Sequence, residues 1–233
     1  MSKKQIEKSV ENDIMYQISR DSATGDLIAE AMYAVDKSLK EVIIPNSVEN
    51  VPVVSIAEGA FAQMYSLKGI ILDYHPYLTV KEKAFAFCPN LTAVCSYTDN
   101  LYLKSKAFFE DSSLSNFMTH SNLSLTGECI FFKCPQLEMI RGLIGKIQNN
   151  ALLGATGLRK IYFDENIELS NSVFNQTALY EVWFKGNANF IGSATPEMLK
   201  NYRIVCSRYS NLASLIYEGY NMDIRSIVRN RDF

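Results

Sequence analysis

The sequence lacks the features that place a protein in a membrane or on nucleic acid. No apolar run approaches the ~18–20 residues of a membrane span, and the N-terminal MSKKQIEKSVEND is not followed by the apolar stretch of a secretory leader. The net charge is only −2, and the charged residues are scattered, so no basic stripe is available for phosphate backbones. We therefore expect no membrane span and no nucleic-acid partner. As written, the chain predicts a cytoplasmic protein, or a cell-surface or secreted one if a leader was removed.

Metal ligands are also scarce. The 233 residues include five cysteines without a CxxC pair and only two histidines. A zinc site needs four converging ligands at short paired spacings, so we predict no metal and no cofactor. The cysteines are expected to be small buried thiols. Cys88 and Cys134 fall at the same repeat offset two turns apart, near 10 Å from each other, which is too far for a disulfide.

No catalytic constellation is present. Nucleophilic catalysis needs a nucleophile, a base and an orienting acid in one place, whereas His75 and His120 stand at different offsets with no evident nucleophile beside them. We expect both histidines to be exposed in loops or at a sheet edge. The glycines of residues 142–146 fail the GxxxxGK[ST] pattern of a phosphate loop and predict a tight turn. The sequence therefore predicts a protein that is not an enzyme.

What the sequence does contain is an internal repeat. Successive strands are predicted to start at a leucine, read as LKGIIL, LTAVCS or LYEVWF, and have apolar residues at the first, fourth and usually sixth positions. The spacings between the leucines are 24, 23, 23, 21 and 21 residues, and an earlier copy starts at Leu39. The leucines with these spacings are Leu67, Leu91, Leu114, Leu137, Leu158 and Leu179.

A second landmark precedes each leucine from Leu67 onward. It is a small or β-branched residue followed by a large one, as in Ala84-Phe85 or Val173-Phe174, five or six positions before the leucine. One such unit cannot bury its apolar face, but stacked turns can, with strands pairing in parallel ~4.8 Å apart. We expect a short helical or 3₁₀ turn at each Ala-Phe pair. Further short strands should form a second side, at 53–56, 78–81, 101–105, 123–125, 144–148 and 167–170.

These motifs resemble the BspA-like subclass of leucine-rich repeats, whose units read roughly I-x-x-x-AF-x-x-C-x-x-L. Val80–Leu91, which reads VKEKAFAFCPNL, follows the pattern closely, and Thr126–Leu137 follows it as well. The resemblance covers about residues 39–190. It implies an α/β repeat solenoid that is rich in β-structure, with a right-handed superhelix and a parallel sheet on one face. Family members are often cell-surface or secreted proteins implicated in adhesion, so the resemblance also implies a non-catalytic binding module.

The ends of the stack should be caps, because bare ends would expose apolar surface and unpaired strand edges. We predict an N-terminal tail and β-hairpin cap over 1–38, about seven repeats over 39–190 and a C-terminal cap over 191–233, all in one structural domain. Residues 1–12 should be a frayed helix or disordered. In the C-terminal cap we expect a helix from Thr195-Pro196 to Lys200, a strand over Arg203–Cys206, and a helix over Asn211–Glu218 that buries Leu212, Leu215 and Ile216.

Strand alternation predicts which side chains meet a partner. If positions one, four and six point inward, position five points outward onto the open face of the sheet. Met, Arg, Tyr and the only Trp occur there, which is the composition of binding hot spots, although strand propensity alone also favours such residues. We predict protein binding through this row, with its Arg141–Tyr162–Trp183 end favoured. An intracellular scaffold or assembly role is the alternative, and the oligomeric state stays open. The predicted row is Ile43, Ile71, Cys95, Met118, Arg141, Tyr162 and Trp183.

Overall fold

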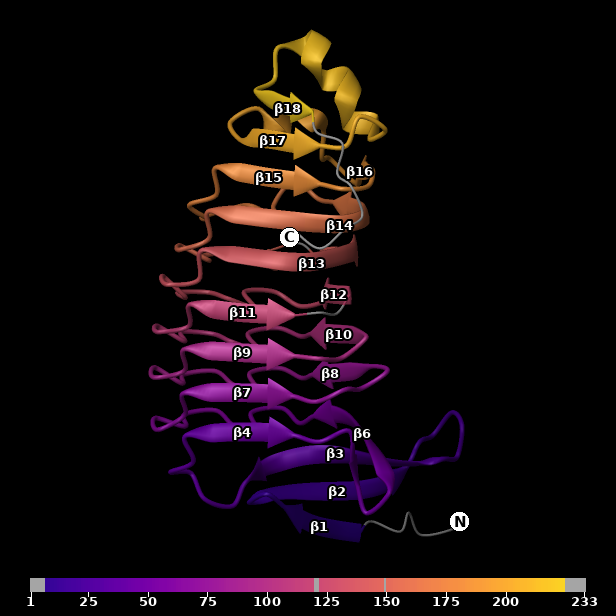
Figure 1. The fold of residues 1–233 in the computed structure, drawn as a ribbon, viewed down its shortest axis with the longest axis vertical. Coiled ribbons are helices and arrows are strands. Elements are labelled where there is room, and N and C mark those ends of the chain that lie inside the picture. Colours follow the sequence, from indigo (N-terminus) through magenta and orange to yellow (C-terminus); the bar gives the residue numbers. More distant parts are fainter. Residues whose placement is uncertain (1–6, 120–121, 149, 225–233) are drawn as a thin grey trace.

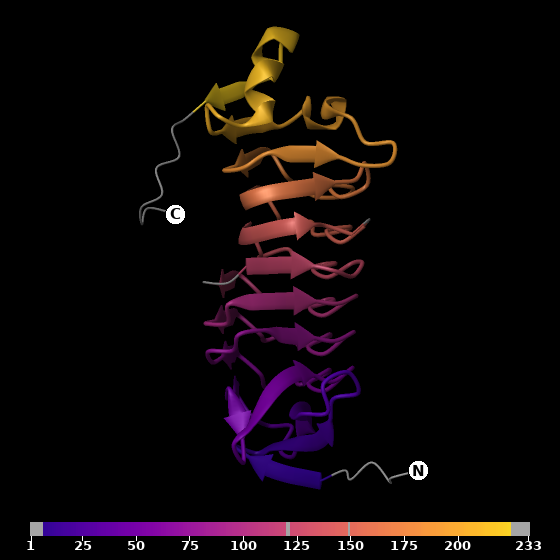
Figure 2. The ribbon, with the colours of Figure 1, turned by 90° about the vertical axis from the view of Figure 1, so that its right-hand side faces the viewer.

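The protein is a single elongated stack of β-strands in this computed structural model, which describes residues 7–119, 122–148 and 150–224 (Figures 1 and 2). The leucine landmarks produce strands that begin two residues after each leucine. The first four form a parallel four-stranded sheet. They are β4 (Glu41–Ile44), β7 (Gly69–Leu72), β9 (Ala93–Ser96) and β11 (Asn116–Thr119).

A second sheet runs along the other side of the stack, where the short additional strands were predicted. Its members pair in parallel with uniform register, so that Leu78, Leu101 and Leu123 follow one another. The short strand β5 (Ser47–Val48) folds back on its first member. The four strands of this side are β6 (Val51–Ile56), β8 (Leu78–Val80), β10 (Asn100–Leu103) and β12 (Asn122–Leu125).

The two sides merge in the later turns. β13 (Met139–Lys146) and β14 (Lys160–Leu169) are long strands that cross from the leucine side to the second side, and β15 (Glu181–Phe184) and β16 (Ala188–Phe190) both pair with β14. The ladder then continues through β17 (Arg203–Cys206) and β18 (Met222–Ile224). The solenoid has about nine turns, and parallel pairing continues through β17 and β18.

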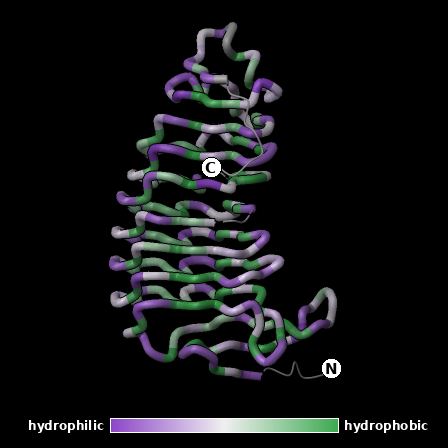
Figure 3. The backbone as a smooth tube through the Cα atoms, viewed as in Figure 1, coloured by the Kyte–Doolittle hydropathy of each residue, from purple (hydrophilic) through white to green (hydrophobic). Residues whose placement is uncertain are grey.

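The core is a column of aromatic rings inside the stack. Successive phenylalanines are stacked with centroids 5.2, 5.5 and 5.7 Å apart and interplanar angles of 10° or less. Phe117 packs edge-on against two of them. Each such pair adds ~0.5–1.5 kcal/mol beyond the burial of its area. Figure 3 shows the apolar segments recurring in every turn. The stacked rings belong to Phe61, Phe85, Phe108 and Phe131.

The Ala-Phe pairs lie in tight β-turns and not in the helical or 3₁₀ turns that we expected. Lys83 and Phe87 have φ of 54° and 62°, and the equivalent residues of neighbouring turns are also left-handed. A left-handed residue interrupts helical continuation. The N–H of Phe87 donates to the carbonyl of Phe109 at 2.8 Å, and that of Glu110 to Phe132 at 2.8 Å. These bonds form a ladder along the turn side.

At the front, β2 (Ile14–Arg20) and β3 (Leu27–Ala34) form an antiparallel hairpin where a hairpin was expected. β1 (Glu7–Glu11) pairs antiparallel with β2, so the prediction of a frayed helix or disorder was wrong for these residues. Its pattern Glu-Lys-Ser-Val-Glu is mostly polar, which suits a strand that closes a sheet edge. Residues 1–6 lie outside the described residues.

At the back, the helices of the C-terminal cap are 3₁₀ helices. They are η1 (Pro196–Leu199) and η2 (Asn211–Glu218), and Gly219 follows the second with φ of 80°. Leu212 and Leu215 are buried as predicted, whereas the side chain of Ile216 lies outside those that the structure describes. No helix among the described residues is long and apolar enough to cross a membrane.

His75 is buried, which corrects our expectation of an exposed histidine. Its side chain lies between the two sheets, with Nδ1 3.0 Å from the carbonyl oxygen of Val53 and Nε2 3.4 Å from that of Ile44. Burial lowers the pKa of His75, although both carbonyl contacts favour the charged form. A neutral imidazole has one N–H group and donates to only one of these oxygens. His75 therefore has a structural role between the two sheets. His120 lies outside the described residues.

The cysteines are free thiols, three of them buried and two, Cys95 and Cys129, half-buried. The Sγ atoms of Cys88 and Cys134 donate to the carbonyls of Phe61 and Phe108, at 3.2 and 3.1 Å. The equivalent position in the turn between them is Asp111, which is 0% exposed. Its Oδ1 accepts the N–H of Cys88 at 2.7 Å, and its Oδ2 has no hydrogen-bond partner among the described residues.

Asp111 should therefore make the stability depend on pH. Burial raises the pKa of Asp111 well above its ordinary value, and the Cys88 hydrogen bond only partly opposes this. A raised folded-state pKa gives stability that is fully present at low pH and is lost as pH rises through that pKa. We expect Asp111→Asn to be more stable than the native protein at pH 8, by about 1–3 kcal/mol. The difference should shrink towards pH 4, as measured by urea unfolding.

Glu58→Gln provides the control, because it removes one exposed carboxylate without touching the core. Its stability should follow the native pH curve. Parallel pH curves for Asp111→Asn and the native protein would contradict the assignment.

Candidate functional site

The first four residues of the predicted outward row lie in register on the outer face of the first sheet. Ile43 pairs with Ile71, Ile71 with Cys95, and Cys95 with Met118. The residues on either side of each along the strand are mostly buried, as alternation requires. Met118 is 54% exposed, and the other three are half-buried.

The last three residues of the row form one stack. Tyr162 pairs with Trp183 across β14 and β15, and their ring centroids are 5.1 Å apart with an interplanar angle of 27°. The guanidinium carbon of Arg141 lies over the Tyr162 ring, 4.8 Å from its centroid. Tyr162, which contacts both, is only 9% exposed. Cation–π and aromatic contacts thus hold the three side chains in fixed positions.

The strand pairing of the row continues beyond Trp183, which the sequence did not reveal, although its next member, Val205, is buried. Trp183 pairs with Val205 on β17, and Val205 pairs with Asp223 on β18. We predicted a strand over Arg203–Cys206, but not that it joins the ladder. The pairing of β17 with β15 aligns Asn201 with the landmark leucine Leu179. Because Asn201 is not a leucine, the repeat pattern did not indicate a further turn there.

A charged network lies beside this stack. Glu181 is 3% exposed, and its carboxylate contacts Lys160 Nζ at 3.3 Å and Arg203 Nη1. Arg203 also bonds Asp223 at 2.7 Å. The indole Nε1 of Trp183 donates to Glu181 at 2.7 Å, which connects the network to the stack. Charges of opposite sign thus alternate across β14, β15, β17 and β18, so that each charged side chain of the network has an oppositely charged neighbour.

The network also sets the protonation of its central carboxylate. Burial by itself would raise the pKa of Glu181, but hydrogen bonds from Trp183, Arg203 and Lys160 outweigh it, so the pKa is lowered. The carboxylate therefore stays charged at neutral pH and anchors its three donors. A carboxylate that is fully paired in this way positions other groups and has little capacity left for an external ligand.

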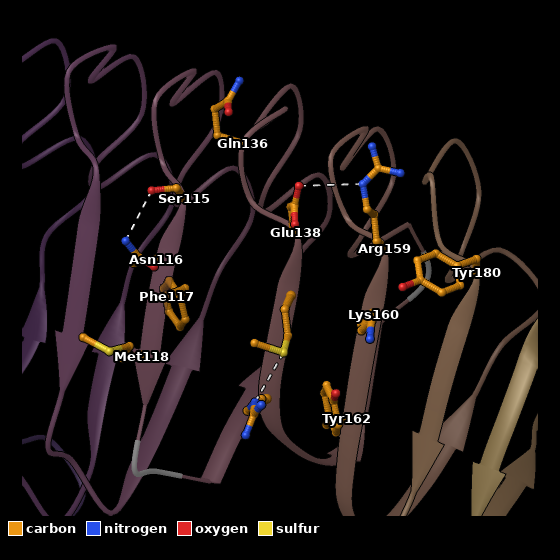
Figure 4. A pocket seen from close by; sticks show the side chains of 12 residues that line it. Ser115, Asn116, Phe117, Met118, Gln136, Glu138, Arg159, Lys160, Tyr162 and Tyr180 are labelled. Atoms are coloured by element: carbon orange, nitrogen blue, oxygen red, sulfur yellow. Dashed lines mark hydrogen bonds and ion pairs between the residues drawn. The ribbon is translucent and has the colours of Figure 1, made fainter. Parts of the chain in front are cut away.

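An open groove of about 700 Å³ lies across the outer face beside the stack (Figure 4). Figure 4 shows Phe117 and Met118 on one side of it and Tyr162 and Tyr180 on the other. The remaining lining residues are mainly polar or charged. They are Ser115, Asn116, Gln136, Glu138, Met139, Arg141, Arg159 and Lys160.

The groove coincides with a break in the sheet. In other turns the residue after the leucine donates its N–H one turn back, as Ser115 does to Thr92 and Arg159 to Glu138. Between described residues, no such bond joins Glu138 to Ser115, and β11 pairs with β9 alone. The outer face is therefore not one continuous hydrogen-bonded sheet.

The length of the repeat explains the break. From Leu114 to Ile130, the landmark of the next repeat, is 16 residues, whereas from Leu137 to the next landmark, Ala151, is only 14. The missing residues come from the corner between the two sheets, so β13 runs directly across, and Leu143 pairs with Leu123 of β12. Register shifts accompany this crossing. A strand that pairs with β12 in the second sheet diverges from β11 in the first.

The described residues offer little reactive chemistry. No group of three or more His, Cys, Asp or Glu among them could hold a metal ion. Burial raises the pKa of Cys88 to about 12 and also raises that of Cys134. The nucleophilic form of cysteine is the thiolate, so these two thiols are inert at neutral pH. The face presents apolar, aromatic and charged side chains.

Comparison with known proteins identifies the family. Six copies of the repeat described as BspA type leucine rich repeat region match residues 26–143 and 79–201, which together cover well over half of the chain. The chain belongs to the BspA-type leucine-rich repeat family. A role in protein interaction is typical of this family.

One solved structure of a leucine-rich repeat protein shows a similar fold. The leucine-rich repeat protein TpLRR of T. pallidum is 19% identical, with 93% of this chain and 98% of that chain covered and a TM-score of 0.59. A leucine-rich repeat protein of Bacteroides capillosus is 19% identical over 77% of this chain and 99% of that one, with a TM-score of 0.40. The pneumococcal vaccine antigen PcpA is 11% identical over 97% and 99%, with a TM-score of 0.29. No curated protein matches the chain.

Removal of the central carboxylate of the network should destabilise the BspA-type stack. A lowered pKa means that Glu181 contributes stability above the ordinary glutamate pKa and loses it as pH falls through the folded-state pKa. We expect Glu181→Gln to lower the free energy of unfolding by about 1–3 kcal/mol at pH 7. The deficit should shrink below pH 4. The emission of Trp183, the only tryptophan, reports unfolding and the loss of its bond to Glu181.

The matched control is Glu138→Gln. Glu138 pairs with Arg159 at 3.8 Å, and its side chain is 71% exposed, so its loss should cost less than about 0.5 kcal/mol. Equal effects of the two substitutions would refute the special role of Glu181.

Proposed function

We propose that this BspA-type repeat protein is a non-catalytic module that binds another protein through the outer face of its leucine strands. The binding site is centred on β11 to β15. The observation that carries the proposal is the Arg141–Tyr162–Trp183 stack beside an open groove. Recognition or adhesion is the role that the family resemblance supports.

The energetics of interfaces support this choice. Binding energy is concentrated in a few Trp, Tyr and Arg residues in well-packed surroundings. The stack supplies all three types, and their mutual contacts order them before a partner arrives, which lowers the entropy cost of binding. Beside them, Met118 and Tyr180 are 54% and 46% exposed, so a partner that covers them would remove apolar surface from water.

A scaffold or assembly role is the second candidate, and one observation favours it. Three phenylalanines form a half-buried column over the turn side, with centroids 5.4 Å apart for Phe87 and Phe109 and 4.9 Å for Phe109 and Phe132. A hollow of about 430 Å³ adjoins Phe87 and Tyr65, and Tyr65 is 62% exposed. An aromatic column of this kind could bind another copy of the chain.

Two variants separate these functions. Met118→Asp introduces a charge at an exposed position of the groove. Phe87→Gln removes one ring from the aromatic column on the turn side. Glutamine is chosen because Gln63 and Gln176 occupy the equivalent left-handed position in other turns. Peptides are first selected on the native protein from a random phage-displayed library. We expect Met118→Asp to weaken the binding of these peptides at least 10-fold, because it charges an apolar contact. Phe87→Gln should leave their affinity unchanged.

Light scattering supplies the second readout. The molar mass of the native protein and of both variants is measured at the same concentrations, and urea unfolding confirms that they fold. Two results would favour the assembly role. One is a loss of peptide affinity in Phe87→Gln but not in Met118→Asp. The other is a multimer of the native protein that dissociates only in Phe87→Gln. Retention of full affinity by Met118→Asp would overturn the proposed site.

A further inference from the structure

The charges of the groove specify the chemistry of its occupant. Building on the proposed function, we propose that the groove binds an extended, acidic segment of a partner protein. A carboxylate of this segment pairs with Arg141, and an adjacent apolar side chain covers Met118 and Met139. The proposal rests on the charge that the groove leaves unneutralised.

Three cations and one carboxylate line the groove. Arg159 pairs with that carboxylate, Glu138, at 3.8 Å, and Lys160 pairs with Glu181 at 3.3 Å. Arg141 forms no ion pair within the described part of the chain. The groove therefore presents one cation without a counter-charge, which an acidic ligand would neutralise.

The position of Arg141 prepares it for a carboxylate. Its guanidinium lies over the ring of Tyr162, and its Nε lies 3.4 Å from Sδ of Met139. Among the described residues, no hydrogen bond occupies its two terminal nitrogens. The cation–π contact uses none of these terminal N–H groups, so they are available for a bidentate pair with a carboxylate. Because stacking has already restricted the side chain, little further ordering is required on binding.

The walls of the groove indicate the rest of the ligand. Met118 is 54% and Met139 37% exposed, on strands at either side of the break, and methionine adapts its shape to an apolar neighbour. The lining residues come from four successive leucine strands or the residues just before them, so a bound segment crosses the strands. An acidic residue beside an aliphatic or aromatic one satisfies both Arg141 and the methionines.

The peptides selected on the native protein test this chemistry. We expect enrichment of Asp or Glu next to an apolar residue. Arg141→Gln, which removes the charge, should weaken these peptides by about 10- to 100-fold, the range of a charge-assisted bidentate pair. For Arg141→Glu the preference should reverse. This variant should bind the original peptides less tightly than peptides in which Lys replaces the enriched acid. Lys104→Glu, an equal charge reversal at an exposed site outside the groove, should change nothing.

The outcomes distinguish this inference from the proposed function. Suppose that the selected peptides require Met118 but carry no enriched acid and bind Arg141→Gln normally. This result would overturn the inference of an acidic partner and leave the proposed binding face intact. Peptides that are insensitive to both Met118→Asp and Arg141→Gln, or a selection that enriches none, would overturn both. Equal losses for Lys104→Glu and Arg141→Gln would show attraction by net charge and refute the specific pair.

Discussion

The fold depends on the stacking of identical side chains at identical offsets. The rings of Phe61, Phe85, Phe108 and Phe131 lie face to face, at spacings slightly wider than the ~4.8 Å between paired strands. A shift of one residue in one of these four turns would move its Phe out of the column. The register of the strands, the hydrogen bonds of the left-handed turn residues and the parallel pairing all follow from this requirement.

The outer face inherits its order from that core. Within each run of paired strands the inward residues are held in register, so the outward residues between them, such as Ile71 and Cys95 or Tyr162 and Trp183, are held in register too. The Arg141–Tyr162–Trp183 stack is the outward counterpart of the phenylalanine column, with a ring spacing of 5.1 Å between Tyr162 and Trp183. A repeat of this kind therefore provides rigid surface side chains without any loop to order them, which is why a binding function suits the architecture.

The strands and their faces could be predicted from the sequence because they depend on local periodicity. Features that depend on contacts between turns could not. Asp111 and His75 are polar residues that sequence alone assigns to the surface, yet neighbouring backbone groups bury and bond them. β17 joins the ladder although Asn201 replaces the landmark leucine, since pairing with β15 determines its place. The seven row residues were named from alternation, but their binding role stays a prediction.

The groove was beyond prediction for a related reason. The repeat shortens from 23 to 21 residues at Leu137, a difference visible in the sequence, but its effect depends on which sheet β13 then joins. A perfectly regular solenoid presents the same surface in every turn and gives a partner no preferred register. The shortening breaks that equivalence at one place, between β11 and β13, and the unpaired cation Arg141 lies beside it. Irregularity in the repeat is thus what can make binding to this face specific.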